Sequence, residues 1–157
     1  LDGHQHVHQL PVIRNSIIEL FKKNLRNSKS YLRICWENPF LVWKRKVSIL
    51  RTLSIGLPGL KLRRLAKRRG IHFNNGFSGV YDLSSSRNFN NLFKSFLIGI
   101  GEQSLIICHP GKNDSGLTSE SLLGENRESE FLFLNSPAFL STLDKEGIRL
   151  GRFSNFS

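Results

Sequence analysis

The sequence predicts an α/β fold, and three observations support that prediction. Short apolar runs that suit strands alternate along the chain with segments of helical periodicity. The 157 residues, 39% hydrophobic and including twelve Phe, are enough to bury the core of one domain. No segment repeats another, which argues against a repeat architecture. We therefore expect a single domain over residues 1–157, built on a mainly parallel sheet or barrel.

The first predicted element is a strand over residues 2–10, where alternation puts four polar side chains on one face: Asp2, His4, His6 and His8. Pro11 suits the first turn of a helix, and the apolar spacing that follows predicts a helix to about Asn27. Residues 31–36 are mostly apolar and predict a second strand, which ends before Pro39.

Residues from about 42 to 70 are predicted to form a basic helical insertion. Leucines recur between the charges, and two amphipathic helices broken at Pro58 fit this pattern best.

The rest of the chain continues the alternation of strands and helices. In order, we expect a strand at 71–73, a helix at 88–100, a buried strand at 105–108 and a polar loop at 112–126. A last helix, begun by Ser136 or Pro137, is predicted to end at Gly147 ahead of a final strand at 148–153.

The histidines of the first predicted strand are the strongest chemical signal in the sequence. Neutral imidazole is the commonest metal ligand in proteins, and side chains two residues apart on a strand project into the same space. The alternative interpretations are that these histidines merely line a polar cleft, or that the segment is the remnant of an expression tag.

A second candidate is His109, which follows the buried strand predicted at 105–108. Sites in α/β proteins form at the carboxyl ends of parallel strands, so this position suits a catalytic residue. A hydrogen-bonded histidine with a purely structural role is the alternative.

These residues resemble the YdjC-like carbohydrate deacetylases. The segment from Asp2 to His8, with Pro11, is similar to the family signature Asp-Ser/Gly-His-x-His-x-His-x-x-Pro. Further matches follow in the family's order: Arg33 with Glu37, Gly76 to Gly79, Ile107 to Gly111, Glu128, Glu130, Leu134, Pro137 and Gly147 to Leu150. The resemblance covers nearly all of the chain, and the ordered set is more specific than any one motif.

The resemblance implies part of a distorted β/α barrel related to polysaccharide deacetylases. It also implies removal of acetyl groups from N-acetylated sugar oligomers with one divalent metal, and we expect Mg²⁺ rather than Zn²⁺. His4 matches the family's metal-ligand position, and His109 matches the histidine regarded as its general acid. We accordingly assign His109 and Asp2 to catalysis and three further residues to substrate binding: His6, His8 and Arg33.

The family's paired aspartates and its other metal-binding histidine have no counterpart in this sequence. Because the chain also lacks Met and opens at Leu1, we expect the C-terminal half of such a domain, inactive by itself. No signal peptide and no apolar run of about eighteen residues is visible, so we predict a cytoplasmic protein without a membrane span. A homodimer stays open.

The competing hypothesis is a basic module that binds nucleic acid or an anionic membrane through residues 44–69. The formal charge is +11, and the segment between Glu37 and Asp82 holds ten Lys and Arg with no acidic residue. The stretch lacks aromatic side chains of the kind that stack bases, so for the enzyme we expect no nucleic-acid partner. The leucines of this segment should be buried in the enzyme and exposed in the binding module.

Overall fold

The computed structural model describes residues 1–25, 30–82, 88–112 and 121–153, with side chains from residue 124 onward in the last range. The elements follow the chain in this order: η1 (His4–Gln9), α1 (Pro11–Asn24), α2 (Pro39–Arg45), α3 (Ile49–Arg68), β1 (Phe77–Ser78), α4 (Phe89–Leu97), β2 (Leu105–Ile106), α5 (Ser121–Leu134) and α6 (Pro137–Lys145).

Parallel pairing between short extended segments organises the fold. Strand β1 pairs with β2 in parallel, Phe77 opposite Leu105, and an isolated parallel bridge joins Leu32 to Phe73. Helices lie between the partners of each pair, α4 in the first and α2 with α3 in the second, which is the predicted α/β connectivity. The strands expected at 31–36 and 71–73 thus shrink to one bridge, and among the described residues no closed barrel is present.

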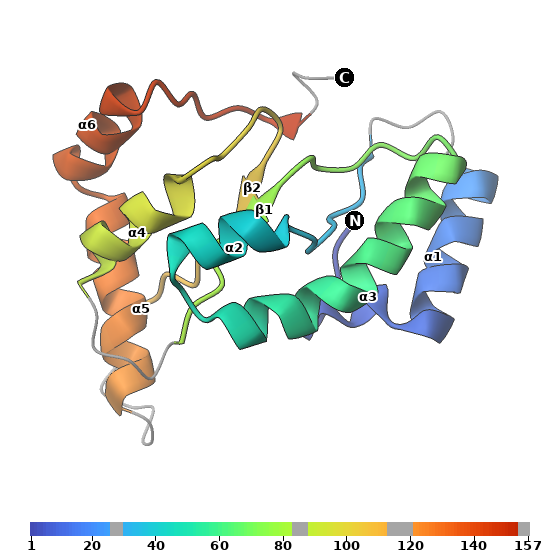
Figure 1. The fold of residues 1–157 in the computed structure, drawn as a ribbon, viewed down its shortest axis with the longest axis horizontal. Helices are drawn as coiled ribbons and strands as arrows, with labels where there is room; N and C mark the ends of the chain where they lie inside the picture. Colours follow the sequence, from blue (N-terminus) through green and yellow to red (C-terminus); the bar gives the residue numbers. More distant parts are fainter. Residues whose placement is uncertain (26–29, 83–87, 113–120, 154–157) are drawn as a thin grey trace.

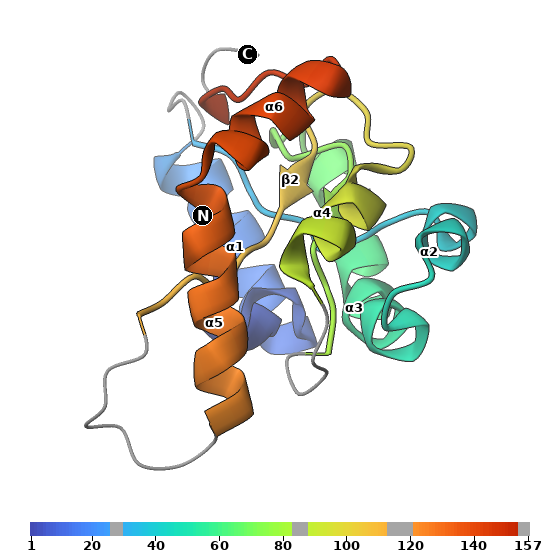
Figure 2. The same ribbon diagram turned by 90° about the vertical axis from the view of Figure 1, so that its left-hand side faces the viewer.

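The helices form two groups on either side of the paired strands (Figure 1). Helices α1 and α3 lie side by side at one end, and α4, α5 and α6 gather at the other, which faces the viewer in Figure 2. The first group buries Ile17, Phe21 and Leu62 against the segment around Leu32. The second encloses a core rich in phenylalanine, whose members include Phe89, Phe93, Phe96 and Phe133.

Residues 2–10 do not form the predicted strand. Gln5 and His6 have φ of 48° and 62°, and these left-handed residues turn the chain within a 3₁₀ segment, η1. The prediction that four polar side chains share one strand face is therefore wrong. Alternation in the sequence could not reveal the turn, because two non-glycine residues with positive φ are uncommon and need tertiary support.

Helix α3 runs unbroken past Pro58, so the predicted break there is wrong. The chain turns earlier, between α2 and α3, where Lys46 and Ser48 have φ of 54° and 30°. Pro58 removes one backbone donor, but close packing supports the helix at this point. A Cβ added at Gly59 would lie 3.2 Å from the carbonyl carbon of Cys35. This glycine lets α3 lie directly against the extended segment beside it.

The polar loop predicted at 112–126 is only partly tested, because residues 113–120 lie outside the described part of the chain. From Ser121 onward the prediction is wrong, since α5 occupies residues 121–134. The last helix is confirmed as α6, and Gly147 follows it with φ of 64°. Helix α1 ends at Asn24, and position 27, where the sequence predicted its end, lies outside the described residues. Residues 148–153 form no strand.

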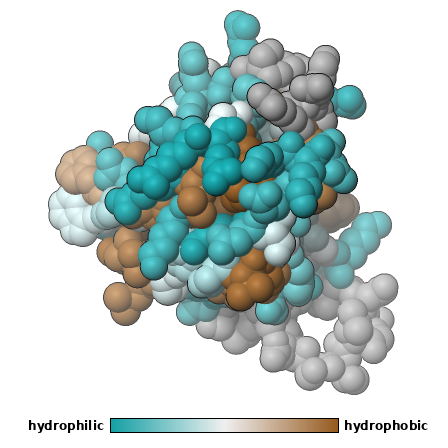
Figure 3. Space-filling model, turned by 90° about the vertical axis from the view of Figure 1, so that its right-hand side faces the viewer, coloured by the Kyte–Doolittle hydropathy of each residue, from teal (hydrophilic) through white to brown (hydrophobic). Residues whose placement is uncertain are grey.

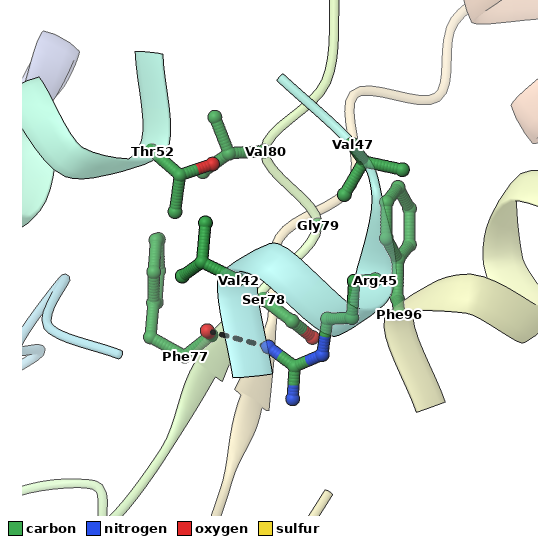
Figure 4. A pocket seen from close by; sticks show the side chains of 9 residues that line it. All are labelled: Val42, Arg45, Val47, Thr52, Phe77, Ser78, Gly79, Val80 and Phe96. Carbon is green, nitrogen blue, oxygen red and sulfur yellow. Dashed lines mark hydrogen bonds between the residues drawn. The ribbon is translucent and has the colours of Figure 1, made fainter. Parts of the chain in front are cut away.

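A buried ion pair holds α2 against β1. Arg45 Nη1 lies 2.9 Å from Glu37 Oε2, which also accepts the Phe77 N–H at 3.3 Å. The guanidinium further donates to the Phe77 carbonyl (Figure 4). It also donates to the Ile98 carbonyl. Glu37, one of the motif residues, therefore fixes the start of β1, beside a cavity of only about 10 Å³.

Hydrophilic side chains cover much of the end of the molecule at which α1 and α3 lie (Figure 3). The leucines of the basic segment divide between core and surface: Leu62 is 0% exposed, but Leu50 and Leu57 are 85% and 62% exposed. Leucine burial therefore does not separate the enzyme from the basic binding module. Within the described ranges, no helix is long and apolar enough to cross a membrane.

Candidate active site

Arg33 lies at the centre of the predicted site at the N-terminal motif. Its Nη2 atom lies 2.5 Å from Asp2 Oδ1, 3.1 Å from His6 Nδ1 and 3.3 Å from the Gly3 carbonyl oxygen. The ion pair with Asp2 neutralises part of the arginine charge, and the Gly3 N–H also donates to Asp2 Oδ1. The structure thus brings together three of the predicted site residues: Asp2, His6 and Arg33.

His8 is a structural member of this cluster. It is 1% exposed, and its Nε2 lies 2.9 Å from the Arg33 carbonyl, which can only accept. We therefore assign the ring proton to Nε2, so that Nδ1 accepts the Gly3 N–H at 3.2 Å. Burial lowers the pKa of His8, which keeps it neutral. Both nitrogens are engaged within the chain, and the predicted role of His8 in substrate binding stays a prediction.

His6 is held through one ring nitrogen, Nδ1. Nδ1 faces the Arg33 guanidinium, an obligatory donor, and lies 3.2 Å from Cys35 Sγ. Burial raises the pKa of Cys35 to about 12, so the thiol is also a donor. Nδ1 must then accept, and we assign the proton of neutral His6 to Nε2. Partial burial, and after it the positive charge of Arg33, lowers the pKa of His6 to about 4. At neutral pH the ring is therefore neutral and offers its Nε2–H as a donor.

The positive φ of His6 lies within this same cluster. Left-handed backbone at a non-glycine residue carries strain that surrounding contacts must hold, and such strain gathers at functional sites. The backbone N–H of His6 donates to the Gly3 carbonyl at 3.1 Å, and its ring packs edge-on against Phe77 at 6.2 Å between centroids. These contacts place His6 next to the start of β1.

His109 follows β2, as predicted, and is exposed. Its backbone N–H donates to Glu130 Oε2 at 2.6 Å. Partial burial of the ring lowers the pKa of His109, while the nearby Glu130 carboxylate opposes that shift. His109 and His6 interact electrostatically, and Arg33 acts on both. The packing agrees, since His6 contacts Cys35 and Phe77, and Ile107, two residues before His109, packs against the cluster that contains both side chains. The two predicted site segments, far apart in the sequence, therefore lie near one another.

The residues present do not by themselves fit a metal ion. In the part of the chain that the structure describes, no three His, Cys, Asp or Glu side chains converge as a ligand set. His6 and His8 present protonated nitrogens or are engaged, and the Asp2 carboxylate is paired with Arg33. His4 is exposed, and it remains the candidate metal ligand of the motif. Its assignment as a ligand stays a prediction.

A cavity of about 260 Å³ lies between α1 and the segment that follows α3. Its walls combine apolar and polar side chains: Ile18, Phe21, Lys22, Leu25, Ser30, Arg69, Gly70, Ile71 and His72. None of the residues that we assigned to catalysis, metal binding or substrate binding lines it, so it does not belong to the predicted site.

The order of the motifs along the chain agrees with a comparison against protein families. The model of the YdjC-like protein family matches residues 1–145. The chain belongs to the YdjC-like family. The YdjC-like proteins are carbohydrate deacetylase-like, so membership favours the enzyme over the basic binding module. No curated protein and no solved structure matches this YdjC-like chain.

Two buried side chains of this YdjC-like chain, Glu130 and Tyr81, carry no role predicted from the sequence. Glu130 was noted only as part of the family resemblance, yet it contacts the His109 backbone directly. Tyr81, on its other side, carried no motif at all. Asn126, Glu130 and Phe133 are buried at helical spacing. Because two of the three are polar, the sequence shows no apolar periodicity that would have revealed this face.

Proposed function

We propose that this chain supplies the general acid and part of the substrate site of a hydrolase that removes acetyl groups from N-acetylated carbohydrates. The observation that carries the proposal is that the segments of His6 and His109, from motifs about a hundred residues apart, meet at Phe77 in a member of the YdjC-like family: His6 packs on its ring, and Leu105 and Ile107 pack against its cluster. Two parallel pairings with helical connections support a further proposal, that these strands are part of a distorted β/α barrel.

In this proposal, His109 donates a proton to the departing nitrogen of the sugar amide. Once water has added to the acetyl carbonyl carbon and lost a proton, the C–N bond breaks, its electron pair stays on nitrogen and takes the proton from His109, and the acetyl group leaves as acetate. Loss of such an acid costs about 10²–10⁴ in rate. The Nε2–H of His6 and the guanidinium of Arg33 would donate hydrogen bonds to an acetylated sugar, while Asp2 orients Arg33. The substrate class is an N-acetylated sugar oligomer.

The proposal includes one divalent metal, for which His4 is one ligand. The other ligands are not among the residues that the described part of the chain brings together. Imidazole nitrogens suit Zn²⁺ better than Mg²⁺, which prefers oxygen, so both metals must be measured. With an incomplete ligand set, we propose that residues 1–157 alone are inactive. The cytoplasmic location and the homodimer stay predictions.

The test uses the complete translation product that contains these 157 residues, with N-acetylated chito-oligomers as substrate. We expect acetate release, a loss of about 10²–10⁴ in kcat for His109→Ala, and unchanged activity for the control His72→Ala, which replaces another exposed histidine. Full activity of His109→Ala would overturn the assignment of the acid. Elemental analysis of His4→Ala should show loss of bound metal, and retention of the wild-type metal content would remove His4 from the site.

A further inference from the structure

A buried carboxylate lies directly behind His109. Glu130 on α5 is 0% exposed, and each of its oxygens accepts one hydrogen bond. Oε1 accepts from the Tyr81 hydroxyl at 2.5 Å, and Oε2 accepts from the His109 backbone N–H at 2.6 Å. Burying a carboxylate is costly unless it is hydrogen bonded, so packing alone does not explain this residue.

Among the described residues, Glu130 forms no ion pair that would offset its burial. The ion pairs within the described ranges join Asp2 with Arg33 or His8, and Glu37 with Arg45. The negative charge of Glu130 is therefore held by two neutral donors. Such a charge acts strongly on nearby titratable groups, because the buried surroundings screen it less than water does.

The two donors come from equivalent places in the fold. Tyr81 follows β1 and His109 follows β2, so Glu130 ties together the carboxyl ends of two neighbouring parallel strands (Figure 1). Burial and then the hydrogen bond to Glu130 raise the pKa of Tyr81 above its ordinary range. Tyr81 therefore remains a phenol and keeps donating to the carboxylate.

Helix α5 holds the His109 loop at a second point. The Gly111 N–H donates to the Arg127 carbonyl at 3.1 Å. Arg127 and Glu130 are three residues apart and lie on one face of the helix, so two alternate amides of the loop are anchored to a single helical turn. This double anchoring sets the path of the chain through Pro110 and the direction in which the His109 ring leaves it.

We propose that Glu130 is a positioning residue, which through the His109 backbone N–H and the Tyr81 hydroxyl holds the His109 imidazole in its place in the site. The proposal rests on the proposed function in one respect, the role of His109 as acid. Its geometric part stands on the contacts alone. The Glu130 charge also favours the protonated ring, against partial burial and three arginines that disfavour it: Arg127, Arg51 and Arg33.

Three variants separate the hydrogen bonds of Glu130 from its charge. Glu130→Gln removes the charge but can keep both contacts, since its carbonyl accepts the His109 N–H and its amide donates to the Tyr81 oxygen. Glu130→Ala removes charge and contacts together. Glu128→Gln is the matched control, because it deletes the same charge from the same helix at a side chain that is not among the groups acting on His109.

The first readout needs no activity and uses the 157-residue chain. Proton NMR of the histidine rings, with His109→Gln to identify the His109 signal, should show a lower His109 pKa in Glu130→Gln and no change in Glu128→Gln. Exchange of the His109 amide with solvent should stay slow in Glu130→Gln and become about tenfold faster or more in Glu130→Ala. An unchanged ring titration together with unchanged amide exchange would overturn the proposal. If Glu130→Ala fails to fold, Tyr81→Phe replaces it in the exchange experiment, and a normal His109 exchange rate there would count against the role of Tyr81.

The second readout is acetate release by the complete translation product. Glu130→Ala should lower kcat by about 10²-fold with KM unchanged, and Glu130→Gln should recover most of that loss. Equal kcat for Glu130→Ala and wild type, with only thermal stability reduced, would show a structural role and overturn the proposal. If the NMR changes occur but the wild-type protein releases no acetate, the proposed function fails while the positioning of His109 stands.

Discussion

Replacing Asn74 should destabilise the fold far more than its size suggests. Asn74 is 1% exposed and makes three hydrogen bonds with main-chain groups. Its Oδ1 accepts the Ile34 N–H at 2.7 Å, and its Nδ2 donates to the Ile34 and Gly76 carbonyls at 2.9 and 2.8 Å. The side chain therefore acts in place of a neighbouring strand for the extended segment around Ile34.

The magnitude follows from these three contacts. Each buried hydrogen bond contributes about 1 kcal/mol net, so Asn74→Ala should lower the free energy of unfolding by about 3 kcal/mol. This is a large share of the total of about 5–15 kcal/mol for a typical domain. With a urea m-value of about 2 kcal/mol per M, the unfolding midpoint should fall by about 1.5 M.

Urea unfolding of the 157-residue chain, followed by circular dichroism, measures this difference. Asn75→Ala is the matched control, because the neighbouring Asn75 is exposed and its side chain makes one long contact, 3.3 Å to the Glu102 carbonyl. The control should change the free energy of unfolding by no more than about 0.5 kcal/mol. Equal midpoints for the two variants would refute the argument that Asn74 completes the main-chain hydrogen bonding.

Two further predictions concern packing and pH. Gly79→Ala should destabilise by about 2 kcal/mol or more, because Gly79 has φ of 94° and the new Cβ would lie 2.2 Å from the Ile107 carbonyl oxygen. Gly101→Ala should not destabilise the fold, because its new Cβ would meet nothing within 4 Å. Similar losses of stability for the two variants in thermal unfolding would contradict this reasoning. Stability should also fall as pH drops through about 6.5, because unfolded chains protonate His8 there while burial keeps the folded form neutral. Between pH 7 and pH 5, urea unfolding should show a smaller loss of the free energy of unfolding for His8→Gln than for wild type. An equal loss would argue against His8 as a source of this pH dependence.

The helices that the sequence predicted well carry a strong periodic signal. In α4, apolar residues at three- and four-residue spacing become the buried face, including Phe89, Phe93 and Phe96. Asn88 caps this helix through its side chain, as its residue type favours. Helix α6 likewise begins at Pro137, and local preferences sufficed because they agree with the tertiary packing.

The strands were predicted less well because their pairing is decided by residues elsewhere in the chain. Residues 31–36 are buried like a strand, but side chains make hydrogen bonds that strand partners would otherwise make: Asn74 bonds to Ile34, and Gln9 Oε1 accepts the Cys35 N–H at 2.9 Å. Gln9 also donates to the Ile55 carbonyl of α3. A polar residue in a sequence gives no sign that it will be buried in this way.

The sequence by itself determined the family, the order of the motifs and the identity of the histidines, because these are properties of residue type and spacing. Only the tertiary structure decided what each histidine can do. The guanidinium of Arg33 sets the tautomer of His6, and the backbone carbonyl of Arg33 sets that of His8. The carboxylate of Glu130 contacts the backbone N–H of His109. Protonation depends on burial and on neighbouring charges, which folding brings from distant segments, so no local pattern could specify it.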